Sequence, residues 1–151
     1  MPKFLRYLQN VRSELKTLEK NRILKKAIWR KDFFLKHPLY INHEETKIRI
    51  KWLKSLKEIE DYLAPLKELD YHQGFMLTSK ISFNTKNFCI NYDVLICDLN
   101  WRVLKRYSSL KPNSYLGVFD KTAIVLVLCE STITYYNIED GDLVCPLANV
   151  N

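Results

Sequence analysis

The spacing of apolar residues changes from a helical to a strand period near Pro38. Between Pro2 and Pro38 there is no glycine and no other proline, so this segment predicts one long helix or a helical hairpin. Its first half carries apolar residues at alternating spacings of four and three, the pattern of a helix-packing seam. The residues of the predicted seam are Phe4, Leu8, Val11, Leu15 and Leu18.

Downstream of Pro38 the pattern predicts strands and one short helical segment. Residues 39–41 and 47–52 alternate polar and apolar side chains at period two, which predicts a hairpin turning around residues 42–45. Leucine and isoleucine recur at near-helical spacing in residues 53–69, where Pro65 interrupts the pattern. This segment predicts a short helix or two helical turns.

From Gly74 onward the pattern is that of a β domain. Residues 92–97 and 123–129 are mostly apolar, and the second run is apolar at every position, as expected of a strand covered on both faces. Asp98 to Trp101 supplies turn-forming residues between the first run and residues 102–104, which predicts a second hairpin. The chain is therefore expected to contain a helical extension at 1–37 and a β-rich domain at 38–151.

The positive charge of the chain lies almost entirely in the predicted helical extension. The formal net charge is +7. Residues 1–36 contain 11 Lys/Arg and 3 Asp/Glu, a balance of 11 − 3 = +8, whereas the rest contains 13 Lys/Arg and 14 Asp/Glu, a balance of 13 − 14 = −1. Such segregation marks this segment as a candidate contact with an anionic partner.

Three interpretations of the basic segment remain open. In the first, its apolar stripe packs on the β domain or on a second copy, and its lysines are solvated. In the second, its basic side chains neutralise the phosphates of nucleic acid or a ribosome. In the third, which is the least favoured, they face anionic lipid headgroups. The basic residues concerned are Arg6, Arg12, Lys16, Lys20, Arg22, Lys25, Lys26, Arg30 and Lys31.

Several classes of protein and site are disfavoured by the sequence. No apolar run approaches the roughly 18 residues of a membrane span, and no signal-peptide core is present, so a cytoplasmic protein is expected. The cysteines are widely spaced, which predicts buried free thiols. The glycines are too scattered for a phosphate-binding loop, and the histidines lack zinc-ligand spacing. We expect neither a metal nor a cofactor.

Acid–base catalysis by a pair of carboxylates is also disfavoured. Asp93 and Asp98 are the acidic residues nearest the strand centre, and their separation of five sends their side chains to opposite faces of a regular strand. Roles in capping or in turn formation are the simpler interpretation.

An ordered set of short motifs resembles the bacterial and archaeal domain-of-unknown-function family 192. No single motif is specific, but their order and spacing agree over roughly residues 73–145. The matching segments are Ser82-Phe83-Asn84-Thr85, Asp93-Val94-Leu95-Ile96-Cys97-Asp98, Asn100-Trp101-Arg102-Val103, Leu110-Lys111-Pro112, Val125-Leu126-Val127-Leu128 and Ile138-Glu139-Asp140-Gly141-Asp142.

The resemblance implies an α+β fold with a mainly β, barrel-like or sandwich-like core, to which residues 1–36 are an addition. It also implies a short helix at residues 131–137, although Thr132 to Tyr136 alone prefers a strand. The usual histidine, glutamate and glycine of the family are replaced by Asn84, Val127 and Ser131. Because the two groups best able to transfer protons are missing, an enzymatic role is disfavoured.

We therefore predict a non-enzymatic binding module whose basic helix contacts an anionic or protein partner. One alternative is a small-molecule-binding or hydrolytic domain with a pocket near Asn84, Thr85, Asp93 and Asp142. The other is a subunit of a homo-oligomer or larger assembly, held together by the seam from Phe4 to Leu18.

Overall fold

The computed structural model describes residues 37–78, 83–116 and 124–146. The chain divides into two units, Met1–Phe33 and Phe34–Asn151. The predicted helix, its apolar seam and its basic residues lie outside the described residues, so these predictions stay untested. The second unit is mostly β and contains every element described below.

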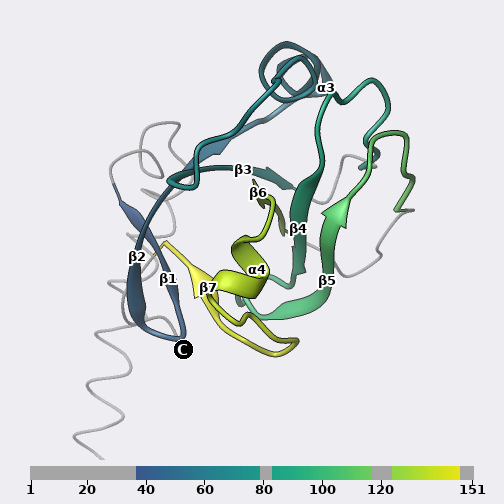
Figure 1. Cartoon of the computed structure of the whole chain (residues 1–151). Coiled ribbons are helices and arrows are strands. Elements are labelled where there is room, and N and C mark those ends of the chain that lie inside the picture. The colour runs from purple at the N-terminus through teal and green to yellow at the C-terminus, as the bar shows by residue number, and fades with distance from the viewer. Residues whose placement is uncertain (1–36, 79–82, 117–123, 147–151) are drawn as a thin grey trace, which may run out of the picture. The chain divides into compact units, whose positions relative to one another are not determined.

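A single curved sheet dominates the described residues (Figure 1). Its seven strands have the order β5-β4-β6-β3-β2-β1-β7, in which only the β2–β3 pair is parallel. The strands are β1 (Pro38–Ile41), β2 (Glu44–Trp52), β3 (Gln73–Thr78), β4 (Tyr92–Cys97), β5 (Val103–Leu110), β6 (Ile124–Cys129) and β7 (Val144–Cys145).

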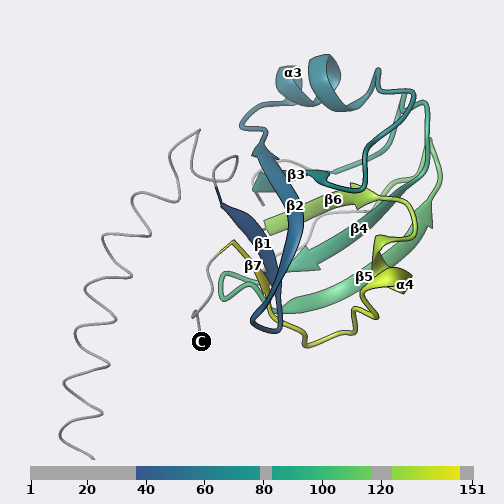
Figure 2. The same ribbon diagram turned by 60° about the vertical axis from the view of Figure 1, so that its left-hand side comes forward.

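The two edge strands of the sheet meet at one end of the domain. Arg102 and Leu143 form an antiparallel bridge, the Val103 N–H donates to the Asp142 carbonyl at 2.9 Å, and the Val144 N–H donates to the Trp101 carbonyl at 2.9 Å. The sheet therefore curls into a half-barrel with few short helices (Figure 2). This confirms the predicted β-rich core and favours its barrel-like form.

The centre of the sheet is the most buried part of the domain. Every side chain of β4 is buried, and in β6 only Cys129 is partly exposed. The predicted apolar runs are thus strands covered on both faces. In β2 the burial alternates instead, with Thr46, Ile48 and Ile50 inward and the residues between them outward.

Both predicted hairpins are present. β1 and β2 pair around Asn42 and His43, which adopt positive φ angles of 48° and 69°. β4 and β5 are joined by a turn in which the Asp98 carboxylate accepts the N–H groups of Asn100 and Arg102 at 2.8 and 3.0 Å. Asp98 therefore has the predicted turn-forming role.

The short helical segment is confirmed, but it is shorter than predicted. α3 (Leu56–Glu58) begins at Ser55, whose hydroxyl accepts the Glu58 N–H at 3.2 Å, and continues into one π-helical turn, η1 (Ile59–Leu63). The helix ends just before Pro65, as a proline requires.

α4 (Thr132–Tyr135) is a helix although its residues favour a strand. The buried Asp93 carboxylate accepts the Ile133 N–H at 2.8 Å, and Ile133 is buried. This tertiary contact outweighs the local preference, as the family resemblance implied.

The prediction of buried free thiols is only partly confirmed. The cysteines, which all lie in the described residues, are free, and Cys97 and Cys145 are buried. The prediction of burial is wrong for Cys89, which is exposed because it lies in a loop before β4 rather than within a strand. No helix in the described part of the chain is long and apolar enough to cross a membrane.

Candidate functional site

A cleft lies beside the first half of β2. β3 pairs with β2 only from Arg49 onward, so the earlier part of β2 has β1 on one side and no strand on the other within the described residues. The turn before β3 and α4 border this gap and leave a cleft of about 550 Å³. We call it the tyrosine cleft; it is lined by Glu45, Thr46, Lys47, Tyr71, His72, Ser131, Thr132, Tyr135 and Tyr136.

Three tyrosines give the cleft its aromatic character. Tyr71 and Tyr135 are 62% and 78% exposed, which leaves much of each aromatic ring open to a ligand. The Tyr135 and Tyr136 rings pack edge to face, with centroids 4.8 Å apart and an interplanar angle of 83°. Burial, followed by the neighbouring Tyr135, raises the pKa of Tyr136, so its phenol stays neutral and can donate a hydrogen bond.

The threonine hydroxyls at the base of the cleft are already hydrogen-bonded. The Thr46 hydroxyl donates to the Leu39 carbonyl at 2.6 Å and accepts the Ile48 N–H at 3.2 Å. The Thr132 hydroxyl donates to the Cys129 carbonyl at 2.7 Å. These bonds fix the base of the cleft, so a ligand meets a preformed surface.

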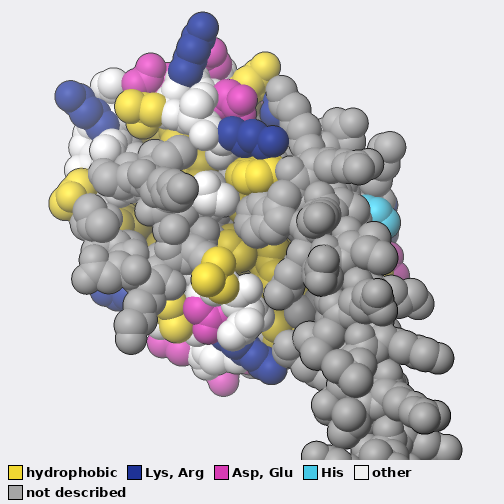
Figure 3. Space-filling view, turned by 180° about the vertical axis from the view of Figure 1, so that it is seen from behind, with side chains coloured by type: hydrophobic (Ala, Val, Ile, Leu, Met, Phe, Trp, Pro, Cys, Tyr) yellow, Lys and Arg dark blue, Asp and Glu magenta, His cyan; other side chains and the backbone are white. Residues whose placement is uncertain are grey.

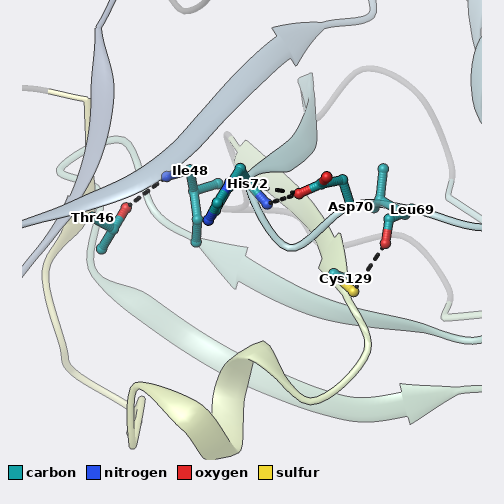
Figure 4. A network of polar contacts seen from close by, with 6 residues as sticks. All are labelled: Thr46, Ile48, Leu69, Asp70, His72 and Cys129. Carbon is teal, nitrogen blue, oxygen red and sulfur yellow. Dashed lines mark hydrogen bonds and ion pairs between the residues drawn. The ribbon is translucent and has the colours of Figure 1, made fainter.

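His72 lines the cleft, and Cys129 lies behind it, where its carbonyl accepts the Thr132 hydroxyl. The Asp70 carboxylate accepts the backbone N–H of His72 at 2.8 Å and lies 3.7 Å from His72 Nδ1 of the ring (Figure 4). The Cys129 thiol donates to the Leu69 carbonyl at 3.3 Å. Burial and then the carboxylates of Asp93, Asp70 and Glu130 raise the pKa of Cys129, so the unreactive thiol persists rather than the thiolate.

Two of the predicted pocket residues lie together in another part of the domain. Asn84 lines a separate cleft of about 520 Å³ between Phe83 and the α3 region, and its side-chain oxygen accepts the Lys86 N–H at 3.0 Å. Thr85 is buried, and its hydroxyl bonds the Lys111 carbonyl at 2.8 Å and the Ser114 N–H at 2.7 Å. Thr85 therefore holds two loops together.

The other two predicted pocket residues serve the backbone elsewhere. The buried Asp93 carboxylate accepts the Ser109 and Ile133 N–H groups, each at 2.8 Å. Asp142 accepts the Glu139 N–H at 2.8 Å within the turn before β7. In the described part of the chain no hydrogen bond or ion pair joins any two of these four residues, so no polar contact ties them into one site.

The structure offers no cluster for a metal within the residues it describes. In that part of the chain no group of three or more His, Cys, Asp and Glu side chains is arranged to hold an ion.

Sequence reasoning missed the tyrosine cleft because its residues come from distant segments that carry no motif. One signal was present: Tyr135 and Tyr136 are adjacent, and adjacent residues point in different directions on a helix or a strand. At least one of these two large aromatic side chains must therefore face away from the core.

Comparisons with known proteins establish the fold alone. No known family profile matches the chain, and no characterised protein matches it significantly. A crystal structure of a protein of unknown function from Novosphingobium aromaticivorans is similar at a TM-score of 0.59 and 20% identity, covering 71% of this chain and 82% of that one. A putative transcription regulator from Sinorhizobium meliloti is similar at a TM-score of 0.55 and 16% identity, covering 64% and 80%.

Proposed function

We propose that this protein is a binding module rather than an enzyme. Its β domain takes a ligand in the tyrosine cleft, and its basic segment at residues 1–36 contacts an anionic or protein partner. The observation that carries the proposal is the preformed cleft with two exposed tyrosine rings. The segregation of charge, +8 in residues 1–36 against −1 in the remainder, supports the second contact.

Two polar groups behind the lining of the cleft support binding over catalysis. The Asp93 carboxylate bonds two backbone N–H groups, and the raised pKa of Cys129 keeps its thiol protonated. A hydrolytic mechanism needs a nucleophile activated by a base, and neither of these groups offers one in this arrangement.

We further propose that the chain is a divergent member of the domain-of-unknown-function family 192. The helix at Thr132–Tyr135 matches what the resemblance implied. The half-barrel sheet is compatible with its barrel-like core.

A salt-dependent binding experiment on the full chain tests the role of the basic segment. Lys16, Lys20 and Arg22 are replaced together by glutamate, and binding to RNA and to ribosomes is measured by co-sedimentation and titration. The matched control replaces the exposed Lys57, Lys67 and Lys111 by glutamate, which changes the net charge equally.

We expect the first variant to lose binding and its salt dependence, because each neutralised phosphate contact contributes about 0.7–0.9 to the slope of log affinity against log salt. The control retains most of both. Equal loss in both variants would show that net charge alone attracts the partner, and the proposal for the segment would fail.

A further inference from the structure

We propose that the outward face of β2, together with the tyrosine cleft, is a binding track for single-stranded nucleic acid. This inference rests on the proposed binding function and names the ligand class of its β-domain site. The track is defined by Lys47, Arg49 and Lys51 on β2 and by Tyr71, Tyr135 and Tyr62 beside it. Figure 3 shows the domain from behind, where basic side chains are scattered among acidic ones rather than aligned.

The basic side chains of the track form a regular ladder. Lys47, Arg49 and Lys51 alternate with the buried Ile48 and Ile50, so they share one face of the strand. Same-face residues of a strand lie about 6.6–6.8 Å apart, comparable to the spacing of phosphates along an extended single strand. Lys47 and Arg49 form no ion pair with the described residues, which leaves both charges open to a phosphate.

Aromatic rings lie at both ends of the ladder. Lys47 lines the tyrosine cleft with Tyr71 and Tyr135. At the other end, Lys51 Nζ lies 3.5 Å from the ring centroid of Tyr62, which is 48% exposed. Bases stack on such rings whatever their sequence, which is how many single-strand binders gain affinity.

The two ends belong to one surface because they adjoin along the β2–β3 pair. A third cleft, of about 310 Å³, contains Arg49, Lys51, Tyr62 and Gln73. Lys47, which lines the tyrosine cleft, and Arg49 are successive residues on the outward face of β2. A strand bound along β2 would therefore pass from one cleft to the other, over a span of about 13 Å between Lys47 and Lys51.

Charge and size favour a polynucleotide over an acidic or apolar peptide. The tyrosine cleft, about 550 Å³, lies in the range of sites that hold a nucleoside-sized group. Glu45 lines the end of this cleft away from Arg49 and repels phosphate there. The phosphates therefore lie along Lys47 to Lys51 while a base enters between the tyrosines.

Fluorescence anisotropy with the full chain tests the track. The probes are labelled oligouridylate, oligodeoxyuridylate and a duplex of the same length. The variants are Tyr135→Ala and Arg49→Gln, and the matched controls are Tyr115→Ala, at a similarly exposed tyrosine, and Lys67→Gln. Thermal unfolding confirms that each variant keeps its fold, which the exposure of these side chains favours.

We expect Tyr135→Ala to weaken single-strand binding about tenfold. Arg49→Gln should lower the slope of log affinity against log salt by about 0.7. The controls should change neither quantity, and the duplex should bind more weakly, because its bases cannot reach the rings. Tighter binding of one single strand identifies its sugar as the preferred one.

Two outcomes distinguish a failure of the track from a failure of the nucleic-acid assignment. If the chain binds the single strands but neither track variant differs from its control, the track is wrong while the proposed binding function stands. If the chain binds none of these probes, or binds an extended peptide in the tyrosine cleft instead, the nucleic-acid assignment is overturned. The ribosome arm of the salt experiment on residues 1–36, which uses none of these probes, then judges the binding function.

Discussion

At the scale of single residues, Asp93 shows how a buried charge can be structural. Its carboxylate is fully buried, yet each oxygen accepts a backbone N–H at 2.8 Å, one from Ser109 in β5 and one from Ile133 in α4. From the sequence, Asp93 was placed in the candidate pocket of an alternative hypothesis, with capping or turn formation as its simpler role. Its contacts instead join a strand and a helix that are far apart in the sequence, and no motif reveals such partners.

Ser131 offers a residue-scale prediction, because it stands where the resembling family has glycine. Its φ of 77° and ψ of 1° lie in the left-handed region, and its side chain makes no capping hydrogen bond. The left-handed conformation costs a residue with a Cβ about 1–2 kcal/mol of stability. Replacing that residue by glycine removes this cost, but it lowers stability by about 0.4–1 kcal/mol because the unfolded chain gains entropy. Ser131→Gly should therefore raise the free energy of unfolding by about 0.5–1 kcal/mol in urea titrations.

The matched control for Ser131 is Gly141, whose φ is 90°. Gly141→Ala introduces the strain that Ser131→Gly removes, so it should destabilise the domain. A lower stability of Ser131→Gly would mean that the serine side chain contributes more than its backbone conformation costs.

At the scale of elements, local patterns predicted the strands better than the helices. β4 and β6 were predicted within a residue because each is a short, mostly apolar run of strand length. The helix α4 was predicted only through the family resemblance, because its own residues prefer a strand. In the structure the contact of Ile133 with Asp93 outweighs the strand preference of Thr132–Tyr135. Such a contact is not encoded within the segment itself.

Gly74 gives an element-scale prediction about how β3 fits between its neighbours. A Cβ at this position would lie 2.8 Å from Ile50 Cδ1, 2.8 Å from Leu128 Cδ2 and 3.2 Å from the Val127 carbonyl oxygen. Because the contacts come from both adjoining strands, Gly74→Ala should overpack the sheet and lower the free energy of unfolding by about 1–3 kcal/mol. Urea unfolding measures this loss.

The neighbouring exposed residue provides the comparison for Gly74. Gln73→Ala lies in the same strand but adds no atoms to the packed interior, so it should change stability by less than about 0.5 kcal/mol. Equal stability of Gly74→Ala and the wild-type chain would show that Ile50 and Leu128 can move aside without cost.

At the scale of the whole molecule, the sequence predicted a β-rich domain but not how its sheet closes. The predicted hairpins and apolar runs are local, whereas the meeting of β5 with β7 joins Arg102 to Leu143, which are distant in the sequence. The candidate cleft was missed for the same reason, since Lys47, Tyr71 and Tyr135 come together only through this long-range arrangement. Only the grouping of charge in residues 1–36 was evident in the sequence as a functional signal.

The stability of the domain should fall in alkaline solution because two buried groups resist ionisation. Burial, then Asp98 and then Cys145 raise the pKa of Cys97, and burial, then Cys89 and then Cys129 raise the pKa of Tyr92. Each group keeps its proton in the folded state after the unfolded chain has released it. Stability is therefore fully present below the unfolded pKa, about 8.5 for cysteine and about 10 for tyrosine, and is lost above it.

Above about pH 8.5 the free energy of unfolding should decrease by up to about 1.4 kcal/mol per pH unit through Cys97 alone. Urea titrations from neutral pH to pH 10 measure the slope. Cys97→Ala should flatten it, whatever its effect on stability at neutral pH, whereas Cys89→Ala at the exposed thiol should leave it unchanged. An unaltered slope in Cys97→Ala would assign the alkaline loss to other groups, because the only proton removed by that substitution is the one held in the core.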